Sequence, residues 1–174
     1  MFEECEVDSY PIDPFFIARK LHYVLRPYSS LPLDDYLRAT FVSPDGYSIL
    51  EKNPDTGLWV PVIYYNDGVS PYRIRWTLLH EIAHCYLGHI DNPDDSQSDI
   101  EEAEANLFAK YALAPPPLIH VCQCATPADV ARTFCLSADA ATYSYDYYLK
   151  WVYYGPRCYQ DFELQLLRLF HLAA

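Results

Sequence analysis

Residues 77–84 read Thr77-Leu78-Leu79-His80-Glu81-Ile82-Ala83-His84, an HExxH motif inside an apolar segment that favours a helix. Two histidines four residues apart on a helix lie about 40° apart around its axis and about 6 Å apart along it, so both imidazoles can bind one metal ion. Glu81 lies about 100° from His80, where its carboxylate can reach a metal-bound water without binding the metal. The motif therefore predicts two metal ligands, His80 and His84, and a general base, Glu81.

The residues around the motif also favour a helix. Ser70-Pro71 is a typical helix start, because Ser is a good N-cap and Pro is preferred at the first helical position. Apolar residues then recur at helical spacing, namely Ile74, Leu78 and Ile82. Gly88 and the polar residues 91–95 end the helix. An ordinary amphipathic helix with two coincidental histidines is the alternative, and this context argues against it.

A catalytic zinc site has three protein ligands and leaves one position for water, so the third ligand must come from another segment. Residues 98–101 form a capping-box pattern from Ser98 to Glu101, which gives Glu101 a structural role at a helix start. On the helix predicted for residues 102–112, Glu102 borders an apolar stripe and Glu104 lies about 160° away from it. Helical geometry alone leaves Glu101, Glu102 and Glu104 open as the third ligand.

Other polar residues near the motif have competing interpretations. His89 is a further candidate ligand, but it lies about 140° around the helix from His84 and is expected to cap the helix end. Asn106 lies one turn after Glu102 on the same face, where it can hydrogen-bond a ligating group. The acidic side chains of the loop are expected to face solvent rather than form a second metal site: Asp91, Asp94, Asp95 and Asp99.

His80-Glu81-Ile82-Ala83-His84, followed by Glu102-x-Glu104-Ala105-Asn106-x-Phe108-Ala109 and a proline, resembles the ImmA/IrrE family of metallopeptidases. The resemblance extends over about residues 40–116 and implies that Glu102, four residues before Asn106, is the third ligand, as in thermolysin-like gluzincins. It departs from the family at Ala114, where a bulky apolar residue is usual, and in a short loop between the two helices.

The same resemblance implies a function and a fold. It implies a zinc-dependent endopeptidase with one Zn²⁺ per chain, whose substrate is a protein or peptide, in particular a transcriptional repressor; a cytoplasmic location is expected separately, because the sequence shows no secretory signal. The expected fold is α+β, with a zincin-like domain (residues 1–117) whose small antiparallel or mixed sheet packs on the HExxH helix. Residues 118–174 are expected to form a helical C-terminal extension packed on that domain. The alternative is a zinc-containing regulatory module that docks a partner without proteolysis.

Composition excludes some functions and locations. The chain has 12 basic and 24 acidic residues, a formal charge of −12, and no visible basic patch, so direct binding to nucleic acid is not expected. The acidic residues 1–6 do not form a signal peptide, and no apolar run is long enough to span a membrane. The six cysteines are therefore expected to be reduced thiols.

Turn and periodicity signals predict the remaining elements. They predict an N-terminal helix over residues 13–26, strands at residues 39–42, 47–50 and 59–65, and helices at residues 127–134, 138–154 and 162–172. Pro61 indicates that the third strand lies at a sheet edge or begins there. The last helix is expected to dock onto the body or onto a second subunit, which would make a homo-oligomer.

Overall fold

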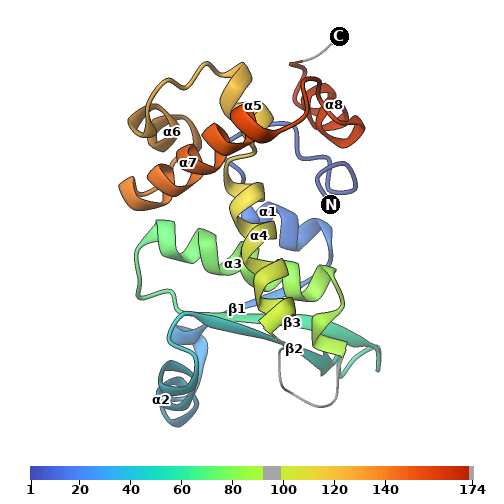
Figure 1. The fold of residues 1–174 in the computed structure, drawn as a ribbon. Coiled ribbons are helices and arrows are strands. Elements are labelled where there is room, and N and C mark those ends of the chain that lie inside the picture. Colours follow the sequence, from blue (N-terminus) through green and yellow to red (C-terminus); the bar gives the residue numbers. More distant parts are fainter. Residues whose placement is uncertain (92–98, 173–174) are drawn as a thin grey trace. The chain divides into compact units, whose positions relative to one another are not determined.

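Figure 1 shows the computed structural model, which describes residues 1–91 and 99–172. The predicted N-cap Ser98 and the loop residues Asp94 and Asp95 lie outside the described residues. The elements are α1 (Pro14–Lys20), β1 (Val24–Pro27), η1 (Tyr28–Ser30), α2 (Leu33–Val42), β2 (Gly46–Lys52), β3 (Trp59–Tyr65), α3 (Pro71–Tyr86), η2 (His89–Asp91), α4 (Asp99–Leu113), α5 (Pro116–Val121), α6 (Pro127–Phe134), α7 (Ala138–Tyr154) and α8 (Asp161–Leu169).

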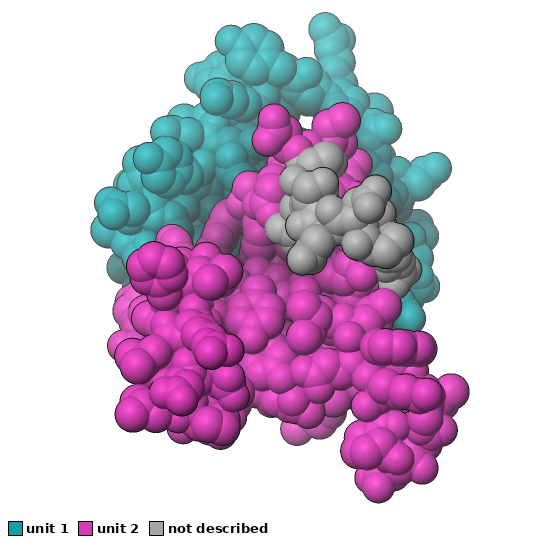
Figure 2. All heavy atoms as spheres, turned by 90° about the horizontal axis from the view of Figure 1, so that it is seen from below, with its two compact units in different colours: residues 1–12, 110–174 teal, residues 13–109 magenta. Residues whose placement is uncertain are grey.

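The chain divides into two compact units, coloured separately in Figure 2: residues 13–109, and residues 1–12 together with 110–174. The division falls inside α4, which continues to Leu113, rather than after residue 117. The first twelve residues belong with the C-terminal segment because their rings pack there, with Phe2 against Phe170 and Tyr10 against Phe134. The domain boundary expected from the sequence stays a prediction.

The unit of residues 13–109 contains a three-stranded mixed sheet in the order β1-β3-β2, so the fold is α+β. Strand β1 runs parallel to β3 and β2 runs antiparallel to it. The prediction that Pro61 lies on an edge strand is wrong, because β3 is the central strand. Pro61 is tolerated there because β1 pairs with β3 only from Val62 onward.

Two predicted elements differ from the structure. Residues 39–42 form the end of α2 rather than a strand, because Ala39 is buried in a cluster with Tyr28 and Val62, and this packing overrides their strand propensity. The N-terminal helix ends at Lys20 instead of residue 26. The chain turns at His22, which has a φ of 59°, and then enters β1.

Helix α3 forms as its sequence predicts. The Ser70 side chain accepts a hydrogen bond from the Arg73 amide, and Pro71 occupies the first turn. Leu78 and Ile82 are fully buried, and α3 packs on β2, β3 and α1. In Figure 1, α3 lies along one face of the sheet, and α2 lies at one end of the sheet on the other side, where Ala39 packs with Val62 and Tyr64 of β3.

The second unit is helical in its C-terminal segment. The predicted helices at residues 127–134 and 138–154 are confirmed as α6 and α7, and the last helix runs over Asp161–Leu169. Helix α5 was not predicted, and it starts at the prolines that also follow the end of α4. No helix among residues 1–91 and 99–172 is long and apolar enough to cross a membrane.

Candidate metal centre

Three side chains from two helices converge in the unit of residues 13–109. Helix α3 provides His80 and His84, and the first turn of α4 provides Glu102. The two Nε2 atoms lie 3.1 Å apart, and the Glu102 carboxylate lies 3.6 Å from His80 Nε2 and 3.4 Å from His84 Nε2. Among the described residues, this is the group of histidine, cysteine and acidic side chains whose ligand atoms all lie within 4.8 Å of one another.

These separations fit a single metal ion. Tetrahedral coordination with bonds of about 2.0–2.1 Å places two ligand atoms about 3.3 Å apart. The observed distances of 3.1, 3.4 and 3.6 Å bracket this value. Two imidazoles and one carboxylate leave a fourth position free, which is the donor set of a catalytic rather than a structural site.

Burial keeps both histidines in the form that binds metals. His84 is fully buried, and burial, with the nearby His80 and His89, lowers its pKa to about 4. Burial also lowers the pKa of His80, while the charge of Glu102 and a hydrogen bond with Asn106 act in the opposite direction. At neutral pH the two imidazoles are therefore neutral and can offer lone pairs to a cation.

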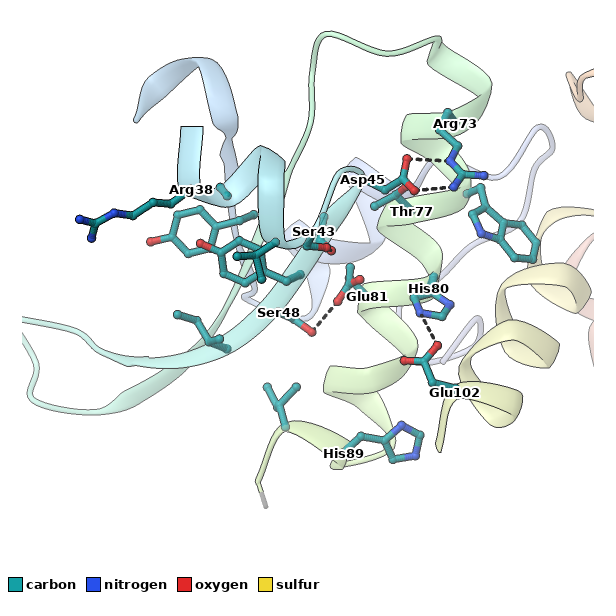
Figure 3. Close-up of a pocket in the computed structure, with 18 of the residues that line it drawn as sticks. Arg38, Ser43, Asp45, Ser48, Arg73, Thr77, His80, Glu81, His89 and Glu102 are labelled. Carbon is teal, nitrogen blue, oxygen red and sulfur yellow. Dashed lines mark hydrogen bonds and ion pairs between the residues drawn. The ribbon is translucent and has the colours of Figure 1, made fainter. Parts of the chain in front are cut away.

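Glu81 points away from the ligand group toward strand β2, as Figure 3 shows. Its carboxylate is buried, and Ser48 donates a hydrogen bond of 2.8 Å to Oε2. Burial raises the pKa of Glu81 from 4.5 to about 7, although the Ser48 hydrogen bond lowers it. A carboxyl group with a pKa near neutrality can both accept and return a proton, as a general base and acid must.

His80, Glu81 and Glu102 border a cleft of about 1150 Å³, whereas His84 is buried behind them and does not line it. Strand β2 forms one wall with residues 46–50, and the pocket-facing side of α2 contributes Arg38 and Val42. At one end Arg73 of α3 donates a 2.8 Å hydrogen bond to Asp45, and this pairing holds the pKa of the Asp45 carboxyl below its usual range. The cleft exceeds the volume of a typical small-molecule pocket and can admit a chain segment.

The rival ligand candidates have other partners. His89 Nδ1 lies 3.1 Å from His84 Nδ1, and His89 Nε2 lies 3.2 Å from the Glu104 carboxylate. Both ring nitrogens of His89 face these side chains, so the prediction that His89 caps the helix is wrong. Glu104 contacts His89, and Glu101 is not a member of the ligand group. Asn106 interacts with His80, as its place one turn after Glu102 predicts.

Sequence reasoning missed two features of the site. Ser48 lies 33 positions before Glu81, and only the pairing of β2 with β3 and the packing of α3 on β2 bring them together. The contact of His89 with Glu104 joins η2 to α4. A weak signal existed for His89, since a third histidine so close to an HExxH motif is a candidate partner for a ligand.

Residues 37–144 match the model of the IrrE N-terminal-like domain, Peptidase_M78. The matched segment includes His80, Glu81, His84 and Glu102 and covers more than half of the chain. No curated protein matches the chain.

Proposed function

The chain belongs to the Peptidase_M78 family of IrrE N-terminal-like metallopeptidases, and from this premise we propose that it is a zinc-dependent endopeptidase. The observation that carries the proposal is the His80, His84 and Glu102 group beside the buried carboxyl of Glu81. We propose a zincin-like domain that holds one Zn²⁺ per chain and acts in the cytoplasm. Imidazole and carboxylate ligands with a free fourth position suit zinc.

Each side chain has a chemical role in this proposal. Bound zinc supplies Lewis-acid activation of a water molecule and of the scissile carbonyl. With the metal bound, Glu81 would act as the general base toward the attacking water and would then return the proton to the leaving amine. Ser48 holds Glu81 Oε2, so that Oε1 remains free to exchange the proton. His80, His84 and Glu102 hold the metal, and Asn106 interacts with His80.

The proposed substrate is a protein segment in an extended conformation. In the described part of the chain, β2 pairs with β3 along one edge, and its residues 46–50 line the cleft. An extended peptide can add to such an edge through main-chain hydrogen bonds, with side chains entering alternate pockets. The family resemblance favours a transcriptional repressor as this substrate.

Zinc content and peptide hydrolysis test the proposal separately. We expect one zinc per chain by elemental analysis of the protein, and loss of most of it in His80→Ala and Glu102→Ala. We expect Glu81→Gln to keep the zinc but to lose at least about a hundredfold in kcat on a library of quenched fluorescent peptides. Retention of zinc in Glu102→Ala would contradict the ligand set, and full hydrolysis by Glu81→Gln would contradict the mechanism.

A regulatory docking module is the second candidate. Helix α7 exposes three tyrosines, Tyr143, Tyr153 and Tyr154, with exposed fractions of 70%, 78% and 87%. Tyrosine is enriched in protein interfaces, so this surface could bind a partner or a second copy of the chain. The Glu81→Gln variant separates the two functions, because docking would survive the substitution whereas proteolysis would not.

A further inference from the structure

His84 has a neighbour on the side of its ring opposite the ligand group. Its Nδ1 lies 3.1 Å from Nδ1 of His89, and the two rings meet edge to face with centroids 5.1 Å apart. Nε2 of His89 lies 3.2 Å from Oε2 of Glu104. The three side chains therefore form a continuous chain of contacts from α3 through η2 to α4, all within the unit of residues 13–109.

For an ionised Glu104 and a neutral His89, the chemistry of the groups gives these hydrogen bonds one direction. An ionised Glu104 carboxylate can only accept, so His89 Nε2 must carry a proton and donate it. In a neutral His89 the other nitrogen, Nδ1, then carries no proton and accepts a hydrogen bond from the Nδ1–H group of His84. His84 is left with a lone pair on Nε2, the atom that lies 3.1 Å from His80 Nε2 and 3.4 Å from Glu102.

The opposite tautomer would be incompatible with a metal. If His84 carried its proton on Nε2, that proton would occupy the space among the three ligand atoms. Burial restricts the two rings, since the His89 side chain is 7% exposed and the His84 side chain is 1% exposed, whereas the Glu104 side chain is 57% exposed. His80 differs, because its buried Nδ1 has no hydrogen-bond partner among the described residues. The contacts through His89 and Glu104 therefore act on His84 and not on His80.

We propose that His89 and Glu104 are positioning residues, which hold His84 in the Nδ1–H tautomer and orient its Nε2 toward the metal. The proposal rests on the metal site of the proposed function but not on peptidase activity. A hydrogen bond from the far nitrogen of a ligating histidine fixes its ring and increases its basicity, and the loss of such a partner costs about 10- to 100-fold in metal affinity.

Substitutions at position 89 separate this role from simple packing. Asparagine can place its side-chain oxygen near the position of Nδ1 and accept the proton of His84. Glutamine is closer in size to histidine but reaches the position of Nε2, so it preserves the contact with Glu104 and not the contact with His84. The proposal predicts that His89→Asn binds zinc more tightly than His89→Gln, whereas a packing role predicts the reverse order.

The experiment measures zinc affinity of the full chain by competition with a chromophoric chelator. We expect His89→Ala and His89→Gln to bind zinc about 10- to 100-fold more weakly than wild type, and His89→Asn to recover most of the loss. Glu104→Ala should weaken binding less than His89→Ala does, and Glu104→Gln, which keeps an acceptor oxygen, less again. Asp99→Asn, an exposed acidic position on the same helix, is the matched control and should change nothing.

A second measurement tests the same proposal without any metal. Long-range ¹H–¹⁵N spectra of the metal-free protein distinguish the two neutral tautomers of His84 by their nitrogen shifts. We expect the Nδ1–H form in wild type and a mixture of both forms in His89→Ala. Wild-type zinc affinity in His89→Ala, or an unchanged tautomer in its spectrum, would overturn the proposal. If the wild type bound no zinc, the proposed function would fail while the spectra still decided the tautomer.

Discussion

At the scale of single residues, Glu81 combines two properties that normally exclude each other, a charge-bearing group and a buried position. Burial raises its pKa from 4.5 to about 7. In the metal-free protein the folded state therefore keeps a proton at pH values between 4.5 and 7, where the unfolded state has released it. The free energy of unfolding falls as the pH rises through this range, because the folded carboxylate must lose that proton in an apolar environment.

We predict that Glu81→Gln stabilises the metal-free protein at pH 8, because glutamine has no charge to bury. The shift in the pKa of Glu81 corresponds to at most about 3 kcal/mol at pH 8, and the gain should vanish near pH 4.5. Urea denaturation of both proteins in the presence of a chelator at pH 5 and pH 8 measures it. An identical difference in stability at the two pH values would contradict the prediction.

We predict that Ser48→Ala reduces kcat by roughly tenfold and moves the acid limb of the kcat profile to higher pH. The Ser48 hydroxyl donates to the Glu81 carboxylate and lowers its pKa, so its removal favours the protonated form that cannot act as a base. Ser48→Thr, which keeps a hydroxyl, is the control and should resemble wild type. A uniform loss of activity at every pH would instead indicate a displaced strand.

The metal ligands could be predicted from the sequence, but the side chains that contact those ligands and Glu81 could not. His80, Glu81 and His84 follow from the spacing within one helix, and Glu102 follows from the family resemblance. Ser48, and the contact of His89 with Glu104, depend on where β2, η2 and α4 come to lie, which no local pattern specifies.

At the scale of elements, the close approach of β2 to α3 brings Ser48 to Glu81. Gly46, the first residue of β2, permits this approach, because a Cβ at this position would lie 2.7 Å from Thr77 Cγ2 and 2.7 Å from the Tyr64 carbonyl oxygen. Neither contact is sterically allowed. The missing side chain at Gly46 therefore contributes to the geometry of the site.

We predict that Gly46→Ala lowers the free energy of unfolding by about 1–3 kcal/mol and also lowers kcat, because β2 must move away from α3. Urea denaturation and peptide hydrolysis measure the two effects. Gly68→Ala is the matched control, since the nearest atom to its added Cβ is the Asn66 side-chain oxygen at 3.2 Å. Equal effects of the two substitutions would show that the contact at Gly46 is unimportant.

Elements with strong local signals were predicted well, and elements that depend on packing were not. Helices α3, α6 and α7 begin at residues with clear N-caps, Ser70, Thr126 and Ser137. The segment 39–42 has strand-forming residues but becomes helical where Ala39 packs against the sheet. Strand β1 has four residues, and its parallel pairing with β3 is too distant in sequence to be recognised.

At the scale of the whole molecule, all three proposed ligands belong to the unit of residues 13–109. Metal binding should stabilise the folded form of this unit directly, because only the folded form brings α3 and α4 together. The other unit supplies no proposed ligand.

We predict that zinc slows hydrogen exchange mainly in α3 and in the first two turns of α4. The amides of α6 and α7 should show little change, since these helices belong to the other unit. Mass spectrometry of peptides from the metal-free and zinc-loaded protein measures the effect, with His80→Ala as the control that removes it. Equal protection of both units would indicate that they unfold as one cooperative body.

The position of the ligands on two helices also has a consequence for turnover in the cell. His84 and Glu102 are 18 positions apart in the chain, so a bound metal closes a loop that the unfolded chain would otherwise explore freely. At a free metal concentration of 100 times Kd, binding adds about 2.7 kcal/mol to the free energy of unfolding. That increment makes unfolding about a hundredfold rarer and restricts the access of degrading proteases. The lifetime of this protein would then depend on the free zinc concentration. As zinc becomes scarce, the amount of protein would fall before the activity of each remaining molecule does.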